Sequence, residues 1–467
     1  MTPELSQSRP LNLVIGIDGA SFHWISKFSN HLPTFHEILS KSLWGTLTSV
    51  IPPTSPPAWS SILTGVNPSR HGVLNFYDID SGEFTPIYTS KYPLLWDILE
   101  KYNLHSAFLW VPLTYPVQRY KKTIIMSGLP TPKLSYKAVN PMKLVHEFKH
   151  YLKILYSEDM SLTCLLNKIW ARFKIVRQLI RRRHLDLVFF VIQETDSVWH
   201  IYNDECYAHR VYVEIDRQLN NFLNELENEG FDYNLLIVSD HGTSDVAFKG
   251  IFFNDLFREL RLLHLKKSVT KNKSKLFNNI GYNKIIQLLT SKLSLFLPFN
   301  LSAKAWVKFR VTSSSGIDFK KSFVYAAHGP TSRYVGLRVK HPRLKNIVNK
   351  VLMELRDSNG PIVEKIYDPE EIFSTIGGKY FDIIARLKSG YAAFETFSPF
   401  KLSIASIKKY IMHSLDGIYI AHGSSFNKGK KDLDILYIFP LILKLLKIPI
   451  PEYCEIKEKD LESMFDS

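Results

Sequence analysis

The sequence predicts a mixed α/β fold in which amphipathic helices pack beside a central sheet. Three largely apolar runs, at 11–17, 185–193 and 234–239, are typical of strands buried on both faces. Between them lie long segments with apolar residues at helical spacing. Each run leads into a segment that contains an aspartate. Because open α/β sheets bind ligands at the carboxyl ends of their strands, we expect a functional site there.

Composition limits the class of protein. The chain has 467 residues, enough for two or three domains, and its 45% hydrophobic content supports a large core. Its net charge of +15 suits an anionic substrate, a membrane surface or nucleic acid, but no nucleic-acid-binding signature is present. The three cysteines are widely spaced and predict a reducing compartment. Without an apolar signal core or a run of about 18 apolar residues, the sequence predicts a cytoplasmic protein.

The stretch IPPTSPPAWSSILTG at 51–65 follows the first predicted strand. Its four prolines hold the hydroxyls of Thr54 and Ser55 in a rigid turn, and 58–64 reads as a short helix. A hydroxyl just before a helix lies near backbone N–H groups and the positive end of the helix dipole, where a phosphate is favoured. A proline-rich turn with an ordinary capping serine explains this stretch equally well.

The remaining elements follow from periodicity. Amphipathic helices over 142–183 end in an arginine run that we interpret as a solvated face. From 256 to 310 the composition becomes basic and then apolar, which favours either a lid over the site or a helix pair on an anionic membrane surface. We place the other helices at 94–102, 207–224, 344–356 and 433–446, and the other strands at 105–110, 322–327, 334–339 and 381–386.

Aspartate and histidine occur together after the second and third apolar runs. Asp196 and His200 are four residues apart, so on a helix they share a face and suit one metal ion. Asp240 and His241 are adjacent, and both reach one site only if the chain turns sharply, which Gly242 permits. Each pair alone is more often a polar strand end. Three strands that all lead into aspartate favour a shared site.

Two further histidines, His413 and His422, flank an apolar strand near the end of the chain. Either could join this site. A third, His328, falls in the turn between two predicted strands and is interpreted as a loop residue.

In this order, the motifs IGIDGAS, PTSPPAWSSILTGVNPSRHGV, ETDSVWH, VSDHG and HSLDGIYIAHG resemble the type I phosphodiesterase/nucleotide pyrophosphatase family of the alkaline phosphatase superfamily. The similarity spans nearly the whole chain. It implies one catalytic domain at 10–467, a three-layer sandwich with a central, mostly parallel sheet flanked by helices. It also implies insertions at about 133–183 (helical) and about 256–320 (a basic helical cap).

The resemblance further implies two divalent metal ions. By motif position, one ion is held by Asp18, Asp240 and His241 with the Ser55 hydroxyl, and the other by Asp196, His200 and His413. His413 is preferred to His422 because it occupies the H-x-x-D-G position of this family. Ser55 stands where the family usually has threonine, and the adjacent Thr54 is the alternative nucleophile.

Residue chemistry leads to the same function. A serine hydroxyl is a poor nucleophile unless a base or metal activates it, and two ions about 3.5–4 Å apart can clamp the attacking and leaving oxygens. Mixed aspartate and histidine ligands suit zinc or manganese. We therefore expect a hydrolase of small anionic phosphate esters, diesters or pyrophosphates, with a phosphoseryl intermediate on Ser55. The alternatives are a phosphomonoesterase or phosphomutase on the same core, or a non-catalytic or membrane-associated binding protein.

Overall fold

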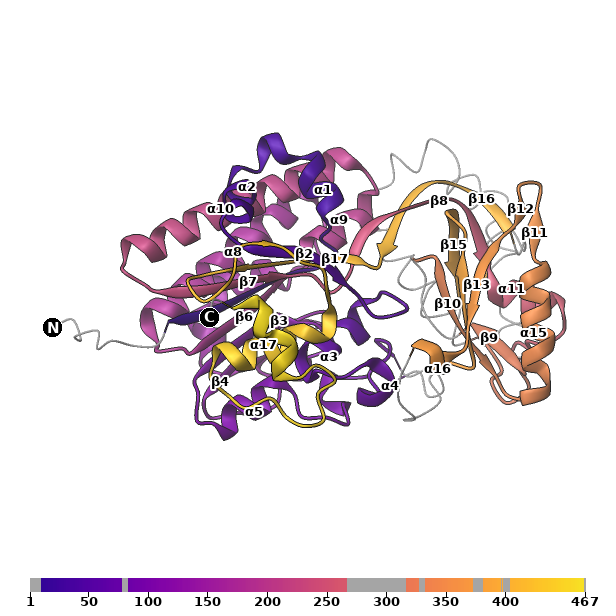
Figure 1. The fold of residues 1–467 in the computed structure, drawn as a ribbon, viewed down its shortest axis with the longest axis horizontal. Helices are drawn as coiled ribbons and strands as arrows, with labels where there is room; N and C mark the ends of the chain where they lie inside the picture. Colours follow the sequence, from indigo (N-terminus) through magenta and orange to yellow (C-terminus); the bar gives the residue numbers. More distant parts are fainter. Residues whose placement is uncertain are drawn as a thin grey trace. The chain divides into compact units, whose positions relative to one another are not determined.

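The computed structural model describes residues 10–77, 83–266, 316–326, 332–372, 381–395, 397 and 404–465. The chain forms two compact units (Figure 1). The first comprises 1–76, 85–244 and 413–467, and the second comprises 77–84 and 245–412. Among the described residues, no helix combines the length and apolar character needed to cross a membrane.

Parallel strands form the centre of the first unit. Strand β1 (Leu11–Ile17) lies between β6 (Leu187–Ile192) and β7 (Tyr233–Val238) and is parallel to both. Strands β3 (Ser106–Val111) and β4 (Thr123–Ser127) continue the parallel arrangement beyond β6. All seven residues of β1 are buried, as expected for a strand covered on both faces.

Antiparallel strands flank this parallel centre. Strand β17 (Asp416–His422) runs antiparallel to β7 on one side and to β2 (Leu43–Thr48) on the other. At the opposite edge, β5 (Val139–Asn140) is antiparallel to β4. Strand β18 (Gly429–Lys430) pairs with β2, and the order β18-β2-β17-β7-β1-β6-β3-β4-β5 confirms the mostly parallel central sheet.

Helices cover both faces of the sheet (Figure 1). One face carries α1 (Phe22–Lys27), α2 (Pro33–Ser40), α8 (Leu162–Arg182), α9 (Glu194–Tyr202) and α10 (Glu205–Asn228). The other carries α3 (Ser55–Thr64), α4 (Pro68–His71), α5 (Leu95–Lys101) and α17 (Ile438–Leu445). The predicted three-layer sandwich is therefore confirmed. Two short helices, α6 (Leu144–Glu147) and α7 (Lys149–Leu155), precede α8.

The predicted helix at 433–446 is wrong in its first third. Residues Leu433–Asp434 form β19, which pairs with β2, and Ile435–Tyr437 form a 3-10 turn before α17 begins. The Asp434 side chain accepts a hydrogen bond from the Leu436 N–H, so it caps this turn. Apolar periodicity did not separate a short edge strand from the helix that follows it.

Among its described residues, the second unit contains three small sheets. Strands β13 (Val363–Tyr367), β14 (Ile383–Leu387), β10 (Tyr334–Val339) and β9 (Val324–Ala326) form a four-stranded sheet. Strands β15 (Gly390–Phe394), β8 (Gly242–Phe252) and β16 (Ile404–Ser414) form a three-stranded sheet, and β11 (Arg356–Asp357) pairs with β12 (Gly360–Pro361). Its longest described helix is α15 (Pro342–Glu354), and a shorter one is α11 (Phe253–Glu259). The predicted pairing of 322–327 with 334–339 is confirmed by the antiparallel ladder between β9 and β10.

Two sequence predictions lie outside the described residues. They are the turn residue His328 and most of the basic segment at 256–320, of which 267–315 is not described. The insertion boundaries at 133–183 and 256–320 accordingly remain predictions.

A buried ion pair anchors the start of α9. The guanidinium of Arg172 in α8 donates from Nε and Nη2 to the two carboxylate oxygens of Glu194, at 3.1 and 2.9 Å. Both side chains are less than 5% exposed, and the guanidinium lies 4.8 Å from the ring centroid of Trp110. Glu194 is the first residue of α9, so this pair fixes the helix that carries Asp196 and His200.

Replacing Arg172 with methionine should lower the free energy of unfolding by about 3–5 kcal/mol, because Glu194 is left as a buried charge without its partner. The matched control is Arg182→Met, which breaks the ion pair between Arg182 and Glu147. Because the Arg182 side chain is 55% exposed, this change should lower the free energy of unfolding by less than about 1 kcal/mol. Urea titration followed by circular dichroism measures both. Equal losses in the two variants would contradict the anchoring role.

Candidate metal centre

Three aspartates converge at the carboxyl edge of the parallel strands. Asp18 directly follows β1, and its N–H bonds the last carbonyl of β6 at 2.9 Å. Asp240 lies two residues beyond β7, and its Oδ1 accepts a hydrogen bond from the Gly19 N–H at 3.1 Å. Asp196 lies in the first turn of α9, just after β6. The structure thus brings together the three aspartates that the strand pattern singled out.

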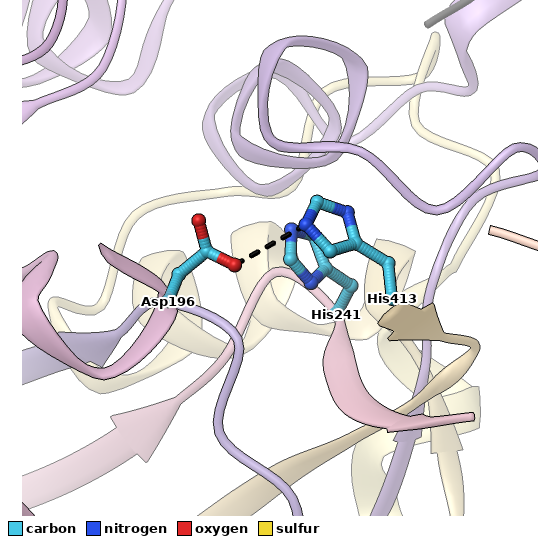
Figure 2. A group of neighbouring side chains, drawn as sticks. All are labelled: Asp196, His241 and His413. Atoms are coloured by element: carbon cyan, nitrogen blue, oxygen red, sulfur yellow. Dashed lines mark ion pairs between the residues drawn. The ribbon is translucent and has the colours of Figure 1, made fainter. Parts of the chain in front are cut away.

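Histidines complete the cluster. Figure 2 shows the rings of His241 and His413 lying one over the other beside Asp196, with centroids 3.8 Å apart. His413 Nε2 lies 3.2 Å from Asp196 Oδ1. His200 Nε2 lies 3.1 Å from both Asp196 Oδ2 and His413 Nε2. The four-residue spacing of Asp196 and His200 therefore places both on one helical face, as expected.

Ser55 adjoins this cluster as the first residue of α3, with Thr54 as the N-cap. Its side-chain oxygen lies 3.3 Å from His241 Nε2. The first turn of α3 offers this hydroxyl fewer backbone N–H groups than a helix start usually does. The next two residues of the helix, Pro56 and Pro57, have no N–H to offer.

Gly242 is needed for a reason other than the one predicted. Its φ is not positive, so it does not provide a left-handed turn after His241. A Cβ at this position would lie 2.2 Å from the backbone carbonyl oxygen of Asp416 and 2.6 Å from Ser414 Oγ. The glycine therefore permits the chain that follows His413 to approach the end of β7 closely.

The alternative histidine is far from the cluster along its strand. His422 ends β17 and pairs with Leu235 near the start of β7, whereas Asp240 follows the end of β7. Its Nδ1 lies 3.1 Å from Ser42 Oγ. The structure therefore groups His413, and not His422, with the predicted ligands.

The three carboxylates are in very different electrostatic environments. Burial raises the pKa of Asp18 well above its ordinary value, with the charge of Asp240 as the next cause. Burial also raises the pKa of Asp240, to about 7. Burial acts in the same direction on Asp196, but His200 and His413 outweigh it and hold the pKa of Asp196 well below its ordinary value. Burial, followed by the nearby His413, lowers the pKa of His241 well below its ordinary value.

The donor set fits divalent cations. One oxygen of each carboxylate, Asp18 Oδ1, Asp196 Oδ1 and Asp240 Oδ2, is buried and accepts no hydrogen bond. Such atoms are rare in folded proteins and call for an explanation, of which an ion is one. Candidate ligand atoms lie within 4.8 Å of one another in two overlapping groups: Asp18, Asp240 and His241, and Asp196, His241 and His413.

The histidine rings are held as metal ligands usually are. His241 Nδ1 lies 3.2 Å from the carbonyl oxygen of Gly242, and His413 Nδ1 lies 3.0 Å from that of Pro53. A backbone carbonyl at Nδ1 fixes the tautomer in which Nε2 carries a lone pair. In both rings, Nε2 faces the carboxylates.

Sequence reasoning missed the backbone groups of this site. Gly19 donates to Asp240, has a φ of +68°, and would place a Cβ 3.1 Å from Asp196. The Asp-Gly dipeptide after a buried strand was the available signal for this tight turn. The carbonyl of Pro53 has no comparable signal, because any residue supplies a carbonyl.

Comparison with known proteins identifies the family. Residues 12–289 match the model of the type I phosphodiesterase/nucleotide pyrophosphatase family. The chain belongs to this family. Members are phosphodiesterases and nucleotide pyrophosphatases, so the chain falls in a class of phosphoester hydrolases. No curated protein matches the chain significantly.

Solved structures of ectonucleotide pyrophosphatase/phosphodiesterase 5 share the fold. The human protein has a TM-score of 0.60 at 16% identity, and the alignment covers 98% of this chain and 100% of that one. The murine protein has a TM-score of 0.59 at 14% identity with the same coverage. An inactive threonine-to-alanine variant of the murine protein, in complex with AMP, has a TM-score of 0.59 at 15% identity, again with 98% and 100% coverage.

Binding of zinc or manganese to the metal-free protein should release protons, because the pKa of Asp240, raised to about 7, leaves this carboxyl partly protonated at neutral pH and the ion displaces that proton. Metal affinity should therefore increase as the pH rises from about 6 to about 8. Calorimetry in two buffers of different ionisation enthalpy measures the protons released. The control variant Asp240→Asn should release fewer. A binding heat that is the same in both buffers would contradict this assignment.

Proposed function

We propose that this chain hydrolyses phosphodiester or pyrophosphate bonds of small anionic substrates, with Ser55 as nucleophile and two divalent ions, zinc or manganese, as cofactors. The observation that carries the proposal is the cluster of three aspartates and three histidines beside Ser55, buried except at Asp196 and His200, in a chain of this family. The AMP complex of a protein with the same fold supports a nucleotide-like substrate.

The proposed ligand sets follow the observed contacts. Asp18, Asp240 and His241 would hold one ion together with the Ser55 hydroxyl, and Asp196, His200 and His413 would hold the other. When bound, such ions lower the pKa of a coordinated hydroxyl and neutralise charge on the attacking and leaving oxygens. Asp196 and His413 are also close to His241, so the two sets adjoin each other.

The chain's own groups position the nucleophile. Ser55 is only 8% exposed, and the helix that it begins is buried along its whole length, so its hydroxyl has a fixed direction. The positive end of the α3 dipole favours negative charge at this point. In the tautomer fixed by the Gly242 carbonyl, His241 Nε2 presents a lone pair toward the hydroxyl.

The proposed reaction has two steps. In the first, the Ser55 hydroxyl gives up its proton and its oxygen forms a bond to phosphorus, while the bond to the leaving oxygen breaks and that oxygen takes up a proton, giving a phosphoseryl enzyme. In the second, water cleaves the bond between that oxygen and phosphorus, and free Ser55 is regenerated. The covalent intermediate divides one difficult displacement into two easier ones.

Replacing Ser55 with alanine should reduce hydrolysis of bis-p-nitrophenyl phosphate by at least about a thousandfold, the scale expected when a nucleophile is removed. Bound metal, measured by elemental analysis, should stay unchanged because the other six proposed ligands remain. The matched control is Thr54→Ala, which removes the neighbouring hydroxyl and should retain activity within several-fold. The reverse pattern would assign the nucleophile to Thr54.

The ratio of diester to monoester turnover tests the substrate class. With zinc or manganese present, kcat/KM for bis-p-nitrophenyl phosphate should exceed that for p-nitrophenyl phosphate. A ratio below one would favour the phosphomonoesterase or phosphomutase alternative. No turnover of either substrate by metal-loaded protein would refute the proposed function and favour a non-catalytic binding protein.

A further inference from the structure

A buried tryptophan connects the Ser55 helix with a predicted metal ligand. Trp59 lies one turn after Ser55 on α3, so the two residues share a face of the helix. Its side chain is completely buried, and its indole Nε1 donates to Asp18 Oδ2 at 3.4 Å. The other oxygen of this carboxylate, Oδ1, accepts no hydrogen bond and lies 3.9 Å from His241 Nε2. The indole thus binds one oxygen of Asp18 and leaves the other directed at the cluster.

The strand below the ring fixes its position. A Cβ at Gly16, two residues before Asp18 in the chain, would lie 2.5 Å from the Cη2 atom of Trp59. The ring therefore occupies space that only a glycine in β1 leaves open. The ring of Phe189 in β6, the strand next to β1, also meets it edge-on, with 6.1 Å between centroids. The N–H of Trp59 is consequently held at one place relative to the end of β1.

We propose that Trp59 is a positioning residue that orients Asp18 toward its metal ion. This inference rests on the proposed function, because it concerns the same site.

An indole is suited to this task. It donates one hydrogen bond, has no acceptor and carries no charge. A lysine or arginine in its place would neutralise the carboxylate and weaken its attraction for a cation. Groups that hold a metal ligand in its orientation typically contribute 10- to 100-fold to metal affinity.

The test replaces Trp59 with phenylalanine, which keeps an aromatic ring and removes the N–H. The matched control is Trp96→Phe. Trp96 is also buried, and its Nε1 donates to Tyr120 Oη at 3.1 Å, outside the metal cluster. Calorimetric titration of each metal-free variant with Mn²⁺ gives the affinities of the two binding events.

In Trp59→Phe, one binding event should weaken about 10- to 100-fold while the other stays within about twofold. Saturating Mn²⁺ should restore kcat, because the nucleophile itself is intact. Trp96→Phe should leave both affinities at the wild-type values. If phenylalanine at position 59 impairs folding, benzothienylalanine can be incorporated there instead. This residue keeps the shape of the indole ring but has sulfur in place of the N–H, so it gives the same comparison.

Three outcomes would overturn the inference. In Trp59→Phe, both metal affinities could be unchanged, or both could fall equally. Alternatively, kcat could stay low at saturating metal, and this result would show that Trp59 acts on packing alone. These outcomes leave the proposed function standing if the wild-type protein binds two ions and hydrolyses the diester. A wild-type protein that binds no ion overturns the proposed function together with this inference.

Discussion

The gathering of three carboxylates in one cluster, with Asp18 and Asp240 buried and Asp196 half-buried, is the constraint on which the rest of the site depends. Ionised carboxylates are costly to bury unless a positive charge lies beside them. Within the described part of the chain, the ion pairs of Asp18, Asp196 and Asp240 are with histidines alone. One oxygen of Asp18 is bound by Trp59, one of Asp196 by His200 and one of Asp240 by the Gly19 amide. The other oxygen of each carboxylate accepts no hydrogen bond. Oxygens prepared in this way favour cations. Burial is the largest cause of the raised pKa values of Asp18 and Asp240, and the charges of neighbouring carboxylates raise them further.

The sheet topology explains why residues distant in sequence meet here. Parallel strands all end at one edge, so β1, β6 and β7 deliver an aspartate each to the same place. An antiparallel neighbour must begin where the parallel strands end. Strand β17 is antiparallel to β7, so the chain just before it, which contains His413, reaches this edge, and His422 at its far end does not. The choice between the two histidines thus follows from the direction of one strand.

Much of this arrangement was predictable from the sequence, and the remainder was not for identifiable reasons. Long apolar runs marked the buried strands, and the four-residue spacing of Asp196 and His200 marked a shared helical face. Apolar runs do not reveal strand order or direction, so the contact between Ser55 and His241, 186 residues apart, could be expected only from the family resemblance. Backbone groups such as the Pro53 carbonyl leave no pattern in a sequence. Pro56 and Pro57 did carry a signal, since proline favours the first turn of a helix, but that helix was predicted to begin only at 58.

These prolines divide the chemistry between the helix and the metal centre. A helix N-terminus commonly binds phosphate through its free N–H groups, but α3 lacks two of them because Pro56 and Pro57 occupy its second and third positions. The helix therefore offers a rigid, buried mount for Ser55 and the field of its dipole, with few hydrogen bonds to phosphoryl oxygens. Charge that develops on those oxygens has to be balanced by other groups. The neighbouring cluster of aspartates and histidines provides for this only when cations occupy it, because its own carboxylates repel a phosphate. In the proposed function, nucleophile placement and charge stabilisation thus belong to separate parts of the fold, and Trp59, a residue of α3 that donates a hydrogen bond to Asp18, connects the two.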